Sequence, residues 1–240
     1  MDEQDSKFAI HAASRDGKTS LVESLLNANP KLSALVDDDG RLPIHWACAY
    51  NHLPIINLLM NIRRPPFDPD VTDASGWTPL MISCSLPNGD GSEAVNLLLS
   101  KDADPNLKTN GGQTALHFAT SKQNLDICRT LLANKAVART KDKRGQLPLH
   151  RAAAIGNVPI LRLLLKEGKS PLDATDIDGS TALHHAISEG HGDIAIELMK
   201  AGADITKKDW EDRLAIELVP DSKVRKYIIQ QAEKEGIDLP

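Results

Sequence analysis

The chain has 240 residues and a formal net charge of −5. It contains no run of Lys and Arg long enough to follow a phosphate backbone, so we predict no nucleic-acid partner. Hydrophobic residues make up 41% of the chain but aromatic residues only 3%, so the core must come from Leu, Ile, Val and Ala, which suits thin layers of stacked helices.

The first residues, Met1 to Asp5, are polar and acidic and lead into no long apolar stretch, so we expect no secretory signal. No run of about 18 apolar residues predicts a membrane span. The three cysteines, Cys48, Cys84 and Cys128, have no metal-ligand spacing, and the chain has no Asn-x-Ser/Thr acceptor site. These features predict a cytoplasmic and nuclear protein that does not associate with membranes.

A five-residue motif recurs along the chain, each time after a glycine. Its copies are Arg41-Leu42-Pro43-Ile44-His45, Trp77-Thr78-Pro79-Leu80-Met81, Gln113-Thr114-Ala115-Leu116-His117, Gln146-Leu147-Pro148-Leu149-His150 and Ser180-Thr181-Ala182-Leu183-His184. With degenerate first and last copies, its final position falls at residues 11, 45, 81, 117, 150, 184 and 217, a spacing of 33 to 36 residues. A period of about 33 residues is that of ankyrin repeats, and the sequence resembles that family over almost its whole length.

This resemblance implies an all-α fold, an ankyrin-repeat solenoid of about seven helix-turn-helix repeats with β-hairpin loops. We expect a single domain over residues 1–240, whose last repeat is a C-terminal cap. The approximate repeats are 5–36, 37–72, 73–108, 109–141, 142–175, 176–208 and 209–238.

Each motif is expected to begin the first helix of a repeat, because Thr caps a helix through its hydroxyl and Pro suits the first turn. Small pairs such as Ala47-Cys48 follow, and they let neighbouring helices approach closely. A turn and a second helix with a Leu-rich stripe come next, and these stripes should stack into the core. The stripes are Leu25-Leu26, Leu58-Leu59, Leu97-Leu98-Leu99, Leu131-Leu132 and Leu163-Leu164-Leu165.

Several copies depart from this pattern. Leu42 and Leu147 replace the capping Thr, and Met81 replaces the His, so these copies should be locally weaker. Residues 87–91 lengthen the third repeat, and residues 63–66 lengthen the link before it. A polar helix over residues 222–231 is expected to close the array.

The histidines are the main candidates for chemistry. Those at the repeat position are expected to bond to backbone through a ring N–H, and they are His11, His45, His117, His150 and His184. His185 and His191 could form a metal site with His184, but His184 should point into the stack and His185 out of it. No nucleophile or phosphate-binding loop stands in a catalytic context. We therefore predict no enzyme activity, no metal and no cofactor.

A partner is expected on the concave side of the array, formed by the hairpin tips and the outward side of each first helix. Three positions of the repeat point that way: four before the repeat His, one after it and five after it. The outward residues by this phase are Arg41, Trp77, Gln113, Gln146 and Ser180; Trp46, Ile82, Phe118, Arg151 and His185; and Tyr50, Leu86, Lys122, Ile155 and Glu189. Four aromatic rings fall on this stripe, which indicates an interaction surface.

The hairpin tips also carry charge in blocks that alternate in sign: acidic early, basic in the middle and acidic late. Such an order predicts a partner with complementary blocks. The candidate partner-binding residues are Asp38, Asp39, Arg41, Trp46, Tyr50, Asp73, Trp77, Phe118, Lys122, Arg144, Arg151, Asp178 and Glu189.

Residues 38–46, 75–80 and 141–153 resemble a narrower group, the gankyrin family with its fungal members, as do the seven-repeat length and the abrupt C-terminal cap. The resemblance implies a chaperone for assembly of the proteasome regulatory particle. Such a chaperone holds the C-terminal domain of one proteasomal ATPase subunit along its concave face, and we expect a monomer on its own. By motif, the family's binding residues carry onto Asp39, Arg41, Trp46, Trp77 and Arg151.

Two alternatives remain open, because a fold does not dictate its partner. One is an ankyrin-repeat regulator that inhibits a kinase or a transcription factor. The other is a purely structural scaffold.

Overall fold

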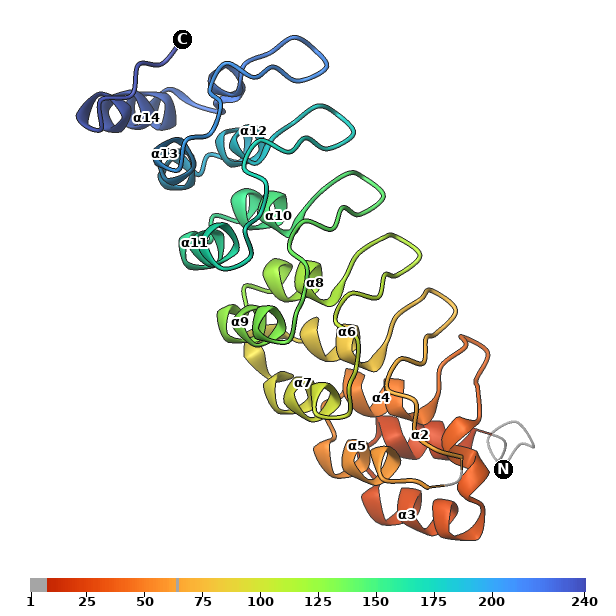
Figure 1. The fold of residues 1–240 in the computed structure, drawn as a ribbon. Helices are drawn as coiled ribbons and strands as arrows, with labels where there is room; N and C mark the ends of the chain where they lie inside the picture. The colour runs from red at the N-terminus through yellow and green to blue at the C-terminus, as the bar shows by residue number, and fades with distance from the viewer. Residues whose placement is uncertain (1–7, 64) are drawn as a thin grey trace. The chain divides into compact units, whose positions relative to one another are not determined.

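In the computed structural model, which describes residues 8–63 and 65–240, the helices come in pairs, and from the second pair on each is preceded by a long hairpin loop (Figure 1). The first helices of the pairs are α2 (Ala9–Arg15), α4 (Pro43–Ala49), α6 (Pro79–Cys84), α8 (Ala115–Ser121), α10 (Pro148–Ala154) and α12 (Ala182–Ser188). The second helices are α3 (Thr19–Ala28), α5 (Leu53–Met60), α7 (Ser92–Leu99), α9 (Leu125–Ala133), α11 (Val158–Lys166) and α13 (Gly192–Lys200). A last pair consists of the 3₁₀ turn η3 (Ala215–Leu218) and α14 (Ser222–Lys234), and two further 3₁₀ turns are η1 (Pro30–Ala34) and η2 (Pro87–Gly89). The all-α repeat fold predicted from the motif is confirmed.

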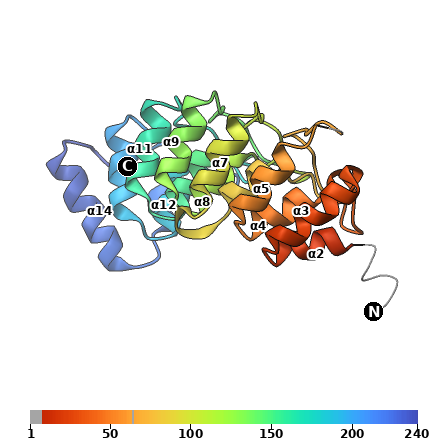
Figure 2. The same cartoon turned by 90° about the horizontal axis from the view of Figure 1, so that it is seen from below.

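The chain divides into two compact units, Met1–Phe118 and Ala119–Pro240. In the first unit, α2, α4 and α6 pack side by side in one row and α3, α5 and α7 in a second (Figures 1 and 2). In the second unit, α10 packs on α12, and α11 packs on α9 and α13. The rows bury the aliphatic stripes, and Leu98, Leu131 and Leu164 have no exposed surface. The three cysteines form no disulfide and are buried, so they are part of this core.

The repeat histidine joins the first helix of one repeat to the hairpin of the next. In the second repeat, the ring Nδ1 of His45 accepts the backbone N–H of Leu42 (3.0 Å), so the neutral ring carries its proton on Nε2 and donates to the carbonyl oxygen of Trp77 (3.2 Å). His150 repeats this arrangement with the N–H of Leu147 (3.0 Å) and the carbonyl of Ala174 (3.0 Å). The same bond forms where Thr is present, as from the backbone N–H of Thr181 to Nδ1 of His184 (3.3 Å), so it does not depend on the capping hydroxyl.

The hairpin loops are closed turns without β-ladders. Among the described residues, bridges occur only singly, between Arg63 and Pro66 and between Lys208 and Leu214. The insertion at residues 87–91 forms η2, and Asn51 donates to the carbonyl of Asp90 across it (2.8 Å). The expected start of the first repeat at residue 5, and Arg64 in the lengthened link, lie outside the described residues.

Helix α14 forms the C-terminal end of the second unit. Only Ile228 and Ala232 of this helix are buried, and the ion pair between Lys200 and Glu235 ties it to α13 (2.9 Å). The helix covers the last apolar layer with one face and exposes mostly polar side chains on the others, with Tyr227 and Ile229 as exceptions, as suits the cap of a repeat array.

Two glycines at positive φ allow a test of how repeats lock together. At Gly156 (φ +73°) an added Cβ would lie 2.6 Å from the ring of His191, whose Nε2 bonds the carbonyl of Ala154 (3.1 Å). At Gly202 (φ +92°) an added Cβ meets nothing within 4 Å. We therefore expect Gly156→Ala to destabilise the fold by about 1 kcal/mol more than Gly202→Ala, since only the first displaces a hydrogen-bonded ring.

The measurement is urea unfolding followed by circular dichroism. In a His191→Ala background, Gly156→Ala should destabilise the fold no more than Gly202→Ala does, because the ring that clashes is then absent. Equal losses for the two glycine variants would refute the steric explanation.

Candidate protein-binding surface

Each hairpin is built around one side chain that accepts hydrogen bonds from its own backbone. It is an aspartate in five repeats and Thr109 in the sixth; we call the five aspartates the hairpin carboxylates, and they are Asp37, Asp73, Asp142, Asp176 and Asp209. Their Oδ1 atoms accept the N–H groups two and four residues later at 2.8 to 3.0 Å. Thr109 accepts the corresponding N–H groups through its hydroxyl at 3.2 and 3.3 Å. These bonds satisfy backbone groups that the turn leaves without ladder partners.

Neighbouring hairpins within a unit are bonded edge to edge. In the first unit, the N–H of Ala74 donates to the carbonyl of Asp39 (3.1 Å). In the second, the N–H of Ile177 donates to Arg144 (2.9 Å) and that of Trp210 to Asp178 (3.1 Å). In each of these pairs, the later tip is fixed by the tip before it.

The second oxygen of each hairpin carboxylate holds a side chain at the candidate surface. Asp37 accepts the indole N–H of Trp46 (2.7 Å), and Asp142 accepts an Arg151 N–H (3.0 Å). In the other hairpins the donors are Arg41 to Asp73 (3.3 Å), His185 to Asp176 (2.8 Å) and Arg213 to Asp209 (2.8 Å). Hairpin carboxylates thus orient four of the residues predicted to face outward: Arg41, Trp46, Arg151 and His185.

In the first unit the predicted aromatic residues form two stacked pairs. Trp46 stacks on Tyr50 with ring centres 6.5 Å apart, and Trp77 stacks on Phe118 at 4.1 Å. Arg41 links the pairs, because its guanidinium lies 4.9 Å from the ring centre of Trp46 and its Nε bonds Asp73, which in turn accepts the backbone N–H of Trp77 (2.9 Å). Tyr50 is 54% exposed, and the other three rings are half-buried.

In the second unit the surface is polar. Arg151 is half-buried beside Asp142, and its Nε is buried without a hydrogen-bond partner among the described residues. Lys122, Arg144, Asp178 and Glu189 of this unit are exposed. The part of the Arg151 guanidinium that stays exposed can pair with a carboxylate of another molecule.

Burial and hydrogen bonds together set the pKa values of several aspartates and histidines at this surface. Burial alone would raise the pKa of Asp37 and of Asp176, but hydrogen bonds from Trp46 to the first and from His185 to the second, with those of the backbone, lower both pKa values. Burial lowers the pKa of His45 and of His184, and burial together with the neighbouring His185 lowers the pKa of His150 to about 4. Asp37 and Asp176 are therefore charged, and His45, His150 and His184 are neutral, near pH 7.

The structure corrects part of the predicted surface. Ile82 is only 6% exposed and Gln146 is buried beside Asp176, so these two positions do not face outward. Asp73 is also buried and holds Arg41 instead of standing at the surface, whereas Asp38 and Asp39 are exposed as expected.

Trp210 is a large exposed residue that the sequence reasoning missed. It is 75% exposed and directly follows the hairpin carboxylate Asp209. That position matches Asp38 of the second repeat, so the position of Trp210 in the repeat could have predicted its exposure.

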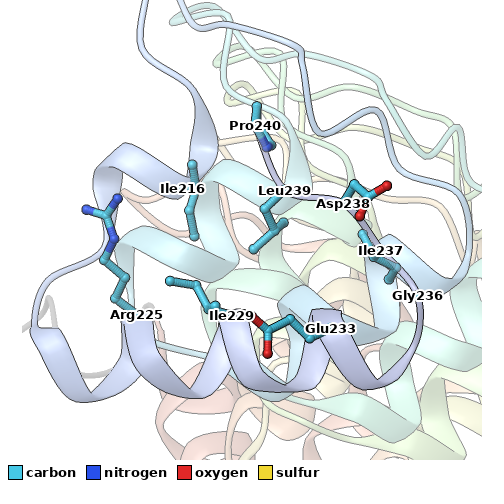
Figure 3. A pocket seen from close by; sticks show the side chains of 9 residues that line it. All are labelled: Ile216, Arg225, Ile229, Glu233, Gly236, Ile237, Asp238, Leu239 and Pro240. Atoms are coloured by element: carbon cyan, nitrogen blue, oxygen red, sulfur yellow. The ribbon is translucent and has the colours of Figure 1, made fainter.

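A cavity of about 460 Å³ lies between η3, α14 and the C-terminal residues (Figure 3). Ile216, Ile229 and Leu239 line it, with Arg225 and Glu233 beside them, and none of its lining residues is a Ser, Thr, Cys or His. In the described part of the chain, no group of three or more His, Cys, Asp or Glu side chains could hold a metal ion, and no helix is long and apolar enough to cross a membrane.

Comparisons with known proteins find matches over most of the chain. A family model for ankyrin repeats, in three copies, matches residues 1–66, 61–142 and 134–209. The chain is 40% identical over 223 residues to an ankyrin repeat-containing protein of Schizosaccharomyces pombe, covering 91% of this chain and 92% of that protein. It is 36% identical over 227 residues to the probable 26S proteasome regulatory subunit p28 of Saccharomyces cerevisiae, covering 93% of this chain and 98% of that protein.

Among solved structures, the human ASB11 ankyrin repeat domain superimposes with a TM-score of 0.80 at 22% identity, covering 92% of this chain and 96% of that one. At this identity the likeness concerns the fold alone.

We expect Asp142→Ala to destabilise the fold by roughly 2–4 kcal/mol, since it removes the acceptor of two backbone N–H groups and of Arg151. Asp142→Asn should cost only roughly 1–2 kcal/mol, because an amide oxygen still accepts both backbone bonds while the ion pair is lost. Urea unfolding measures both. Equal losses would mean that the backbone bonds contribute nothing.

Stability should also fall with acid before the carboxylates titrate. His150 has a folded-state pKa of about 4 against an ordinary 6.5, so the unfolded chain binds the proton first and the stabilisation is complete only above about pH 6.5. It should decline by up to about 3 kcal/mol as the pH falls from 6.5 to 4. His150→Gln should flatten this part of the stability profile; an unchanged slope in the variant would contradict the assignment.

Proposed function

This chain belongs to the ankyrin-repeat proteins and, among them, to the gankyrin family, and we propose that it is a non-catalytic assembly chaperone of the proteasome regulatory particle. In this proposal it binds the C-terminal domain of one proteasomal ATPase subunit. It acts as a monomer in the cytoplasm and nucleus, without a cofactor.

The observation that carries the proposal is the full-length likeness to a probable proteasome regulatory subunit, which covers 93% of this chain and 98% of that protein. A likeness confined to a few repeats would support only a shared fold, because ankyrin repeats serve many partners.

The aromatic pairs of the first unit support a protein partner. Trp46, Trp77 and Phe118 are half-exposed rings held in place by stacking, and the guanidinium of Arg41 also lies against Trp46. Rings that are already ordered lose little entropy when a partner covers them, and Trp and Arg dominate binding energy at protein interfaces.

The polar surface of the second unit supports a partner with acidic groups at this point. Arg151 on α10 pairs with Asp142, and 28% of its side chain is still exposed. Arg144, in the same hairpin as Asp142, is exposed as well. The exposed part of either guanidinium can pair with a carboxylate of a partner. In the first unit, the exposed Asp38 and Asp39 favour basic groups on the partner.

The cysteines support a reducing compartment and no thiol chemistry. All three are buried and form no disulfide, and burial raises the pKa of Cys48 and Cys128 to about 12. A thiol with so high a pKa is neither a nucleophile nor readily oxidised.

Purified C-terminal domains of the proteasomal ATPase subunits, presented one at a time, test the proposal by isothermal titration calorimetry. We expect one of them to bind, and Trp77→Ala to weaken that binding by about 30-fold or more, as for an anchor that contributes about 2 kcal/mol. Trp77 is a better probe than Trp46, whose indole bond to Asp37 also stabilises its hairpin.

The matched control is Tyr227→Ala, which removes an exposed ring on α14 outside this surface. It should leave the affinity unchanged. Binding to none of the ATPase domains would overturn the proposal, and tight binding to a kinase or transcription factor instead would favour the regulatory alternative.

A further inference from the structure

The geometry points to a second recognition site at the tips of the last two hairpins, where Trp210 and Asp178 receive an arginine side chain from a basic segment of a partner protein. This site belongs to the second unit alone. It does not depend on the partner named in the proposed function.

Trp210 is fixed in position although it is mostly exposed. Its indole N–H donates to the carbonyl of Ile177 (2.8 Å), and its backbone N–H donates to the carbonyl of Asp178 (3.1 Å). The ring also covers Gly179, where an added Cβ would lie 3.0 Å from ring atom Cδ2. One face of the indole therefore packs on the neighbouring hairpin in a single orientation.

The rest of the ring faces outward. Trp210 is 75% exposed, and Ile177 beside it is 58% exposed. Two large apolar side chains side by side at a loop tip contribute nothing to the core, and such patches on folded proteins mark interaction sites. A ring that is already ordered loses little further freedom when a partner covers it.

The charge around the ring selects the partner. Residues 173–180 and 207–213 together carry six acidic and three basic side chains, a net charge of −3. The basic ones are engaged, because Lys207 bonds the carbonyl of Asp173, Lys208 pairs with Asp212, and Arg213 pairs with Asp209. The exposed carboxylate of Asp178 has no ion-pair partner in the described part of the chain. It is one residue from Ile177, whose carbonyl anchors the indole.

An exposed indole whose backbone is bonded to the residue that carries an unpaired carboxylate fits a cation that is flat enough to stack. Trp is the best aromatic partner for a cation, and the planar guanidinium of arginine both stacks on rings and pairs with carboxylates. The chain provides one such contact itself, since the guanidinium of Arg41 lies 4.9 Å from the ring centre of Trp46. There the ring is already occupied by its own chain, whereas Trp210 remains open.

The probe is a blocked peptide with two arginines separated by glycines, titrated into the full chain and followed by the indole N–H resonances of the three tryptophans. We expect the Trp210 resonance, assigned by its loss in Trp210→Phe, to move with a dissociation constant in the roughly millimolar range. The same peptide with citrulline, which is planar but neutral, should bind roughly fivefold more weakly.

Asp178→Asn should reduce the response to the arginine peptide, and the matched control Glu167→Gln, which neutralises an exposed acid at the end of α11, should not. The Trp46 and Trp77 resonances should stay in place in both variants, which reports an intact fold. Equal binding of the arginine and citrulline peptides, or no movement of Trp210, would overturn the site.

Movement of the Trp210 resonance on dilution of the protein alone would also overturn it, because a second copy of the chain would then cover the patch. None of these results bears on binding of an ATPase domain, which is measured separately with Trp77→Ala.

Discussion

The bonds made by the hairpin carboxylates determine much of what this molecule presents to a partner. A long loop without a β-ladder leaves backbone N–H groups unsatisfied, and a buried N–H without an acceptor is costly. One aspartate in each of five repeats accepts two of these groups and then one side chain through its second oxygen. Because the same carboxylate fixes the loop and orients that side chain, the shape of the hairpin and the position of the recognition residue are coupled.

This coupling explains why the candidate surface is ordered before any partner arrives. Trp46 and Arg151 are held by Asp37 and Asp142 of their own hairpins, so little side-chain entropy remains to be lost on binding. It also gives such residues two roles, and a substitution at Trp46 changes both the hairpin and the surface. The pair of Trp77 and Phe118 lacks this double role, since stacking alone orients the two rings.

The last hairpin has the same carboxylate-centred loop as the others, but its carboxylate holds a different side chain. Asp209 holds Arg213 of its own turn, so no side chain of a first helix covers this tip. The residue after the carboxylate, an exposed aspartate in the second repeat, is here Trp210. The repeat frame therefore supports an open indole at the end of the array without any change in the core.

Sequence by itself determined the repeat period, the helix pairs, the aliphatic core and the absence of any catalytic motif, because these depend on local patterns and on the direction of Cβ along a helix. It also placed Trp77 and Phe118 at positions that the structure stacks together. Tertiary structure alone decided which outward positions are open: Ile82 and Gln146 are covered, and Trp210 is exposed. The physical reason is that periodicity fixes where a side chain points, whereas its exposure and hydrogen bonds depend on the hairpin of the next repeat, more than 30 residues away along the chain for pairs such as Arg41 and Asp73.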